Sequence, residues 1–138
     1  MKIFVLGSIP TYKWSEDRDL SEQELPFVRA AHDVGYEAAR RGHTLIVSVD
    51  HPASADAHTV AGLVKYLAEH PDRTADVVVN RSEGAPAAFG GLPDSVRVQR
   101  NFHTEIGAGV KGTGSLIPNL ASLEMCDIAL IIGGGVTV

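Results

Sequence analysis

The strongest structural signal in this sequence is a short apolar segment with its turn, IFVLGS at residues 3–8. Four consecutive apolar residues are typical of a strand that is buried on both faces, and Gly7 ends the run. The same arrangement recurs at residues 128–132, where IALII is followed by three glycines. Two such units predict a buried parallel sheet whose strands end in glycine turns.

Helical and strand-like patterns alternate between these two units. Ser54 or Asp56 is the predicted N-cap of the second of three helices. Residues 80–94 are rich in Gly, Ala and Pro, and we predict a loop there. The alternation predicts one α/β domain over residues 1–138, with a Rossmann-like parallel sheet and helices on both faces. Helical spacing covers residues 26–41, 57–68 and 116–123, and further strands are expected at residues 45–49, 77–79 and 96–99.

Length, composition and charge narrow the class of protein. The 138 residues are 44% hydrophobic and 21% charged, which is ordinary for a single globular domain. A net charge of −5 argues against a nucleic-acid partner, whereas backbone N–H groups can still hold a small anion. Cys126 is the only cysteine, and no segment reaches the roughly 18 apolar residues of a membrane span. We therefore predict a cytoplasmic protein without disulfides or direct membrane contact.

The glycine turn after residue 132 has a further implication. In a doubly wound fold, such a turn normally opens another helix whose N-terminus faces the ligand. The sequence holds no such helix after Gly135, so the last strand would lack a covering segment. We expect the fold to be truncated after this turn and the chain to be a fragment of a longer protein.

Small residues follow the first and last strands, at the edge of the sheet where open α/β folds bind ligands. Glycine lets the backbone approach a phosphate or ribose closely, and hydroxyl side chains add hydrogen bonds. The alternative is that these glycines only make tight turns. The full G-x-G-x-x-G fingerprint is absent, so ordinary dinucleotide binding is not predicted. The predicted ligand cradle consists of Gly7, Ser8, Gly133, Gly134, Gly135 and Thr137.

Three further groups of residues are candidates for ligand contact. Tyr12 and Trp14 lie in a long polar connection, where they could form a lid that stacks on a base or pack on the domain edge. Asp50 follows the second strand, where an acid contacts a ribose hydroxyl in dinucleotide folds; a simple role before the helix is equally compatible. Arg100 borders the fourth strand and could bind phosphate with two hydrogen bonds, or remain solvated.

Candidates for metal binding and catalysis are few. Asp50, His51, Asp56 and His58 are metal-ligand types, but their spacing matches no zinc pattern. We predict no metal and no other cofactor. Asp50 and Glu124 are the candidate catalytic carboxylates, and no acid–base pair can be named for either of them.

Three segments together resemble the SLOG superfamily of Rossmann-like domains. They are residues 3–10 (IFVLGSIP), residues 27–49, and residues 116–135, which end in CDIALIIGGG. This superfamily includes the LOG phosphoribohydrolases and the LOG-like sensor domains linked to sirtuin or TIR effectors in bacterial antiphage defence. The resemblance implies a nucleotide-derived ligand at the strand ends, in a cradle of Gly7, Ser8 and residues 133–137.

The sequence also departs from the LOG enzymes. Those enzymes carry an arginine on the helix before the last glycine strand and a glutamate after the glycine segment. Residues 115–120 contain no arginine, and no glutamate follows Thr137. The departures argue against LOG-type hydrolysis.

Three functions remain open. The first is a sensor that binds a nucleotide-derived signal, such as an ADP-ribose derivative or a cyclic nucleotide, and passes the event to a fused effector in a homo-oligomer. The second is an enzyme that cleaves an N-glycosidic bond, like LOG proteins or nucleoside deoxyribosyltransferases, with Asp50 near the ribose. The third is an interaction module whose glycine turns are purely structural. The missing arginine and glutamate favour the sensor.

Overall fold

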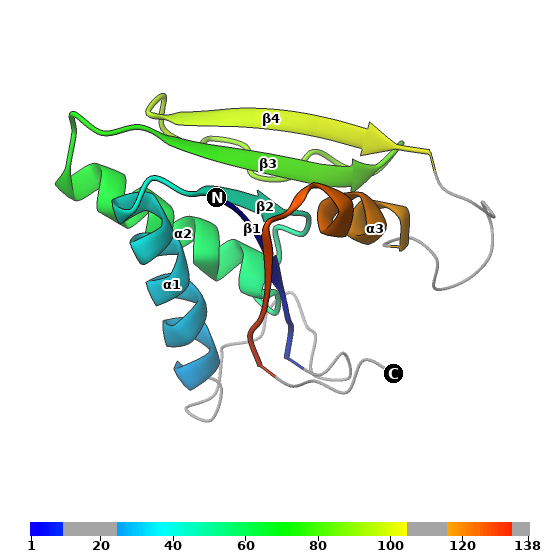
Figure 1. The fold of residues 1–138 in the computed structure, drawn as a ribbon, viewed down its shortest axis with the longest axis horizontal. Helices are drawn as coiled ribbons and strands as arrows, with labels where there is room; N and C mark the ends of the chain where they lie inside the picture. The colour runs from blue at the N-terminus through cyan, green and yellow to red at the C-terminus, as the bar shows by residue number, and fades with distance from the viewer. Residues whose placement is uncertain (10–24, 105–115, 134–138) are drawn as a thin grey trace.

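The computed structural model describes residues 1–9, 25–104 and 116–133. Strands and helices alternate along these residues, as the sequence predicts (Figure 1). In chain order the elements are β1 (Lys2–Leu6), α1 (Leu25–Arg40), β2 (Thr44–Val47), α2 (Ala55–Glu69), β3 (Ala75–Ser82), β4 (Val96–His103), α3 (Leu116–Met125) and β5 (Ile128–Ile131).

The five strands form one sheet in the order β4-β3-β2-β1-β5, and every neighbouring pair is parallel. The chain winds outward from β1 through β2 and β3 to β4. It then returns to the other side of β1 with β5. The direction of winding therefore reverses between β1 and β5, which is characteristic of a doubly wound, Rossmann-like sheet. The predicted fold class is confirmed.

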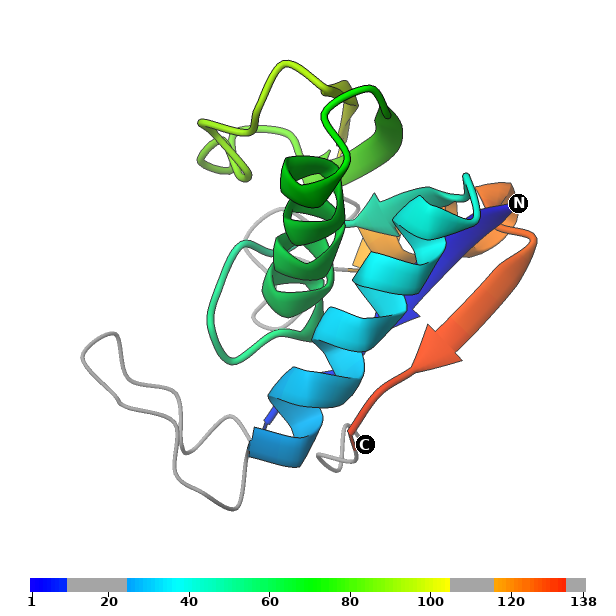
Figure 2. The same cartoon turned by 90° about the vertical axis from the view of Figure 1, so that its left-hand side faces the viewer.

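Helices cover both faces of the sheet, as predicted. α1 and α2 lie side by side on one face of the sheet (Figure 2). The core on this face includes Val5 and Val79. α3 lies on the other face, where Met125 packs against Phe4 and Ile46. Burial on both faces explains why these strands are apolar at successive positions. None of the described helices is long and apolar enough to cross a membrane.

The helices α1 and α2 touch through their backbones. Gly35 of α1 faces Thr59 of α2, and an alanine Cβ built at Gly35 would lie 1.7 Å from the Thr59 carbonyl oxygen. Gly62 of α2 faces His32 in the same way, and the corresponding distance is 1.9 Å. The absence of a side chain at both positions therefore sets how closely the two helices approach.

The end of β2 and the start of α2 are shaped by one carboxylate. β2 ends at Val47 rather than at Val49, because the amides of Ser48 and Val49 donate to Asp56 Oδ2 at 2.6 and 2.9 Å. Of the two predicted N-caps, Ser54 is the observed one, and its Oγ accepts the Asp56 amide at 3.2 Å. The Asp56 side chain thus binds the end of the strand instead of capping its own helix.

The third and fourth strands are longer than predicted. β3 continues to Ser82, so the prediction of a loop from residue 80 was wrong for three residues. β4 pairs with β3 in parallel along its whole length, and this pairing gives backbone hydrogen-bond partners to the polar residues of both strands. The connection between the two strands, residues 83–95, contains no helix, and its Ala88 and Phe89 are buried in the core on the side of α1 and α2.

Candidate functional site

The reversal point between β1 and β5 brings two glycine turns together. Leu6 and Ile131 are partners in the sheet, and the Ile132 amide donates to the Leu6 carbonyl oxygen at 2.8 Å. Gly7 follows with a φ of 146°, and a Cβ there would lie 1.8 Å from the Ile132 carbonyl oxygen. Only glycine fits this contact, so the turn after β1 lies directly against the end of β5.

Gly133 lies beside the first turn of α1. Its φ is 78°, and a Cβ at this position would lie 2.6 Å from the Phe27 ring. Phe27 is the third residue of α1, so the N-terminus of this helix borders the turn after β5. A helix N-terminus carries partial positive charge and free N–H groups, which favour anions. Packing within the protein accounts for glycine at both turns and brings a helix N-terminus to the strand ends.

Ser8 is tied to the start of α2. It forms an isolated antiparallel bridge with Ser54. On one side, the Ile9 amide donates to the Ala53 carbonyl oxygen at 2.9 Å. On the other side, the Ala55 amide donates to the carbonyl oxygen of Gly7 at 2.9 Å. The turn after β1 is therefore held between the end of β5 and the N-terminus of α2.

Three of the predicted ligand residues, Gly7, Ser8 and Gly133, thus lie at one corner of the sheet. The remaining residues of the predicted cradle and lid lie outside the described residues: Tyr12, Trp14, Gly134, Gly135 and Thr137. No known protein family, curated protein or solved structure matches this chain. Its function therefore has to be inferred from the geometry of the site, and the likeness to SLOG domains stays a resemblance.

Asp50 and Arg100 both bind the connection between β3 and β4. Asp50 Oδ2 accepts the Phe89 amide at 3.1 Å. Arg100 donates through Nη2 to the Phe89 carbonyl oxygen at 2.9 Å and through Nη1 to that of Ala88. These bonds hold the connection in place, and contacts of either side chain with ribose or phosphate stay predictions. Glu124 is exposed on α3, and its catalytic role also stays a prediction.

The metal-ligand types around the start of α2 are engaged separately. Asp56 accepts amides at the end of β2, the Ala53 amide donates to His51 Nδ1 at 3.0 Å, and His58 Nε2 lies 2.6 Å from the Pro52 carbonyl oxygen. Within residues 1–9, 25–104 and 116–133, no three His, Cys, Asp or Glu side chains gather at a place that could hold a metal ion.

Asp56 is a buried carboxyl, only 4% exposed, whose role the sequence did not reveal. Burial raises its pKa from 3.8 to about 6, although hydrogen bonds from the Val49 and Ser48 amides favour the charged form. Arg81 Nη1 donates to the Ser48 carbonyl oxygen at 2.9 Å. This oxygen belongs to the same peptide group as the Val49 amide. Asp56 therefore holds the end of β2 through backbone amides, and Arg81 holds it through a backbone carbonyl group.

The raised pKa of Asp56 predicts how stability depends on pH. The folded state binds the proton more tightly than the unfolded state, so this stabilisation is complete below about pH 4 and is lost as pH rises through 6. A shift from 3.8 to about 6 corresponds to about 3 kcal/mol. In Asp56→Asn, one amide oxygen can still accept both N–H groups, and we expect this pH dependence to disappear.

Urea unfolding of the wild type and Asp56→Asn between pH 4 and pH 8 measures this effect. The wild type should lose stability relative to the variant across that range. Parallel curves for the two proteins would show that Asp56 does not titrate as described.

A polar cluster beneath α3 was missed by the sequence analysis. Asn80 is fully buried, and its Nδ2 donates to Ser122 Oγ at 2.8 Å. Its Oδ1 accepts from Asn101 Nδ2 at 3.0 Å and lies 3.2 Å from His103 Nε2. Ser122 Oγ donates in turn to the Pro118 carbonyl oxygen at 2.8 Å. The buried members are hydrogen-bonded to one another, so the cluster fixes α3 on β3 and β4.

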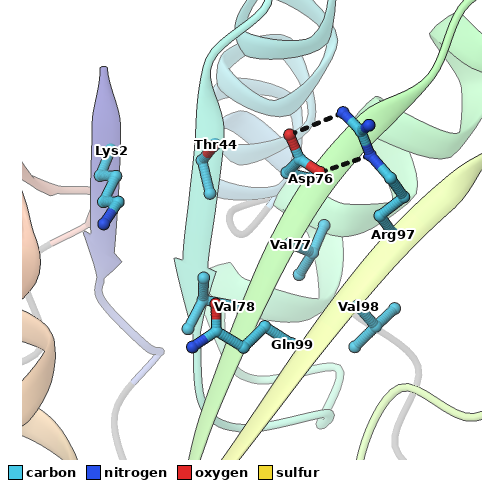
Figure 3. Close-up of a pocket in the computed structure, with 8 residues that line it drawn as sticks. All are labelled: Lys2, Thr44, Asp76, Val77, Val78, Arg97, Val98 and Gln99. Carbon is cyan, nitrogen blue, oxygen red and sulfur yellow. Dashed lines mark hydrogen bonds and ion pairs between the residues drawn. The ribbon is translucent and has the colours of Figure 1, made fainter.

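A groove of about 250 Å³ lies at the amino ends of the strands (Figure 3). Lys2, Thr44, Asp76 and Arg97, from four neighbouring strands, form part of its lining. Open α/β sheets bind ligands at the carboxyl ends of their strands. The groove therefore lies at the opposite end of the sheet from the predicted ligand site.

Proposed function

We propose that this protein binds a nucleotide-derived small molecule at the carboxyl ends of β1 and β5 and acts as a sensor of that molecule. The observation that carries the proposal is the reversal of winding between these strands, which sets the Gly7 turn against the end of β5 and beside α1. Open α/β sheets bind ligands in the crevice at such a reversal. Helix N–H groups can hold phosphate without basic side chains, which suits a chain of net charge −5.

The resemblance to SLOG domains supports the ligand class and the cellular role in this proposal. It favours an ADP-ribose derivative or a cyclic nucleotide as the signal, sensed in the cytoplasm during antiphage defence and passed to a fused effector domain. Ile131 on the edge strand β5 is 78% exposed, which supports assembly into a homo-oligomer.

Binding rather than catalysis is favoured by the surroundings of the two candidate carboxylates. Asp50 accepts the Phe89 amide, and Glu124 is exposed on α3. No acid–base pair that includes either one is present in the described part of the chain. General acid–base chemistry needs such a positioned pair, so a binding role fits these residues better.

Isothermal titration calorimetry of the chain with ADP-ribose, NAD and cyclic nucleotides tests the proposal. We expect saturable heat from at least one of these ligands. A complete lack of heat at millimolar ligand would contradict the proposal. Chromatography of the same mixtures separates binding from cleavage, because free base that is released by the wild type and not by Asp50→Asn would replace the sensor by an enzyme.

A further inference from the structure

Arg81, on β3, carries a buried polar atom without a hydrogen-bond partner. Its Nε is the one such side-chain atom among residues 1–9, 25–104 and 116–133. Nη1 donates to the Ser48 carbonyl oxygen at 2.9 Å, so the unpaired side of the guanidinium is the edge formed by Nε and Nη2. A buried N–H group that has lost water without gaining an acceptor is rare and calls for an explanation.

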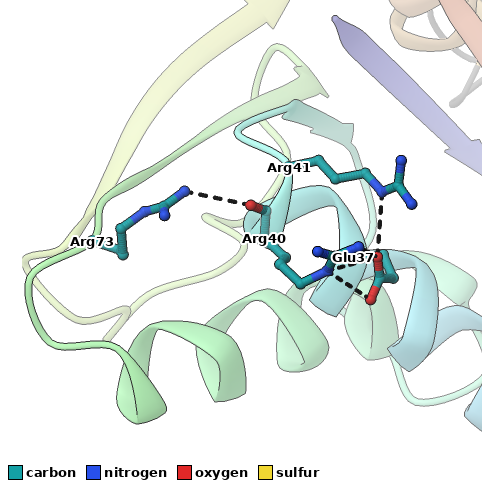
Figure 4. A network of polar contacts seen from close by, with 4 residues as sticks. All are labelled: Glu37, Arg40, Arg41 and Arg73. Atoms are coloured by element: carbon teal, nitrogen blue, oxygen red, sulfur yellow. Dashed lines mark hydrogen bonds and ion pairs between the residues drawn. The ribbon is translucent and has the colours of Figure 1, made fainter.

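The Nε–Nη2 edge is the side through which two other arginines of this chain bind carboxylates. Arg97 donates to Asp76 through Nε and Nη2 at 2.7 and 3.0 Å (Figure 3). Arg40 donates to Glu37 through the same two atoms at 3.0 and 2.7 Å (Figure 4). Arg97 and Arg40 are exposed, whereas Arg81 is half-buried. An oxyanion would stabilise the half-buried Arg81 guanidinium more than an exposed one. Among the described residues, however, no carboxylate lies at the Nε–Nη2 edge of Arg81.

The position of Arg81 indicates which oxyanion it would meet. It lies at the carboxyl end of β3, and its partner on β4 is Phe102. Partner residues of parallel strands share a face of the sheet, and Phe102 is 51% exposed. A guanidinium edge and an exposed aromatic ring on the same face of two neighbouring strands suit a phosphorylated nucleotide, because arginine pairs with phosphate in bidentate fashion and aromatic rings stack on bases.

We infer that Arg81 and Phe102 form a second ligand subsite, in which the Nε–Nη2 edge of Arg81 binds a phosphate and Phe102 stacks on a base. The inference deepens the proposed function and rests on it for the rest of the ligand. β3 lies two strands from β1 in the sheet, which corresponds to about 10 Å. A ligand that reaches both places is extended, with two units joined by a pyrophosphate. ADP-ribose and NAD meet this requirement, and cyclic mononucleotides do not.

The ¹⁵N NMR signal of the Arg81 Nε–H group tests the subsite in the wild-type chain. The signal is assigned by its loss in Arg81→Lys. We expect inorganic phosphate, AMP and ADP-ribose each to shift it saturably, with ADP-ribose acting at the lowest concentration. A signal that none of the three moves overturns the inference, and the titrations themselves use only the wild-type chain.

Calorimetry of variants supplies a second measurement. Arg81→Lys keeps the charge but cannot pair with two oxygens at once, so it should bind ADP-ribose about 10-fold more weakly. Phe102→Ala should weaken AMP and ADP-ribose by a similar factor but leave phosphate unchanged. Arg73→Lys, at an exposed position just before the amino end of β3, is the matched control and should bind as the wild type does. Equal affinity of Arg81→Lys and the wild type for ADP-ribose would overturn the inference.

The same experiments separate this inference from the proposed function. Binding of ADP-ribose that shifts the Gly7 and Gly133 amides but leaves the Arg81 signal unmoved would remove the second subsite and keep the proposed function. The opposite result is that phosphate and AMP move the Arg81 signal while no ligand shifts the two glycine amides. It would keep the second subsite and remove the proposed function.

Discussion

Replacing Gly35 by alanine is expected to lower the free energy of unfolding by about 3 kcal/mol, and Gly62→Ala should act similarly. A Cβ at Gly35 would lie 1.7 Å from the Thr59 carbonyl oxygen, and one at Gly62 would lie 1.9 Å from that of His32. Both obstacles are backbone atoms, which cannot rotate away as the end of a flexible side chain can. The helices α1 and α2 would have to move apart.

Helix propensity acts in the opposite direction in these variants. Alanine is more favourable than glycine inside a helix by about 1 kcal/mol. The steric effect should win, because moving α1 from α2 loosens the packing of buried residues on both helices, such as Ala31 and Leu63. Thermal unfolding should show a decrease in Tm of about 10 °C.

Gly90→Ala is the control for the two helical glycines. Nothing lies within 4 Å of a Cβ built at Gly90, and its backbone is not left-handed. Its stability should change by less than about 0.5 kcal/mol. Wild-type or higher stability of Gly35→Ala would contradict the backbone contact between the helices.

The second large effect is expected at the turn after β1. Gly7→Ala should lower the free energy of unfolding by about 3 kcal/mol. The new Cβ would lie 1.8 Å from the Ile132 carbonyl oxygen, and the φ of Gly7 is 146°. The strain is relieved by separating β5 from β1. Hydrogen exchange should therefore quicken most at the Ile132 amide, which donates to Leu6.

Ser8→Ala is the matched control for this turn. The bonds that Ser8 and its neighbours make to the start of α2 involve the backbone, so the variant should keep them and unfold as the wild type does. Unchanged protection of the Ile132 amide in Gly7→Ala would contradict the close contact of the two strand ends. Because Gly7 variants are expected to disturb the fold, they are unsuitable for measuring ligand contacts.

The order of elements could be predicted because the apolar signals are local. The runs at residues 3–6 and 128–132 have no polar interruption, and Ser54 marks the start of α2. The ends of β2 and β3 could not be predicted, because they depend on partners distant in sequence. Asp56 takes the amides that would have extended β2, and pairing with β4 carries β3 through Asn80. Neither partner is visible in local periodicity.

The candidate site was predictable in outline and not in its side chains. Glycine after each strand indicates Gly7 and Gly133, since strand ends in a parallel sheet share an edge. Arg81 carried no signal, because an arginine after an apolar run resembles any solvated loop residue. Its role emerges only from the Ser48 carbonyl group and from the register that sets it beside Phe102.

Backbone amide NMR during titration with ADP-ribose is the most direct test of ligand binding at the β1–β5 reversal. We predict that the largest saturable shifts occur at Gly7, Ser8 and Gly133. Shifts concentrated at Thr44 and Val78, which line the groove at the amino ends of the strands, with no response from the two glycine turns, would contradict it.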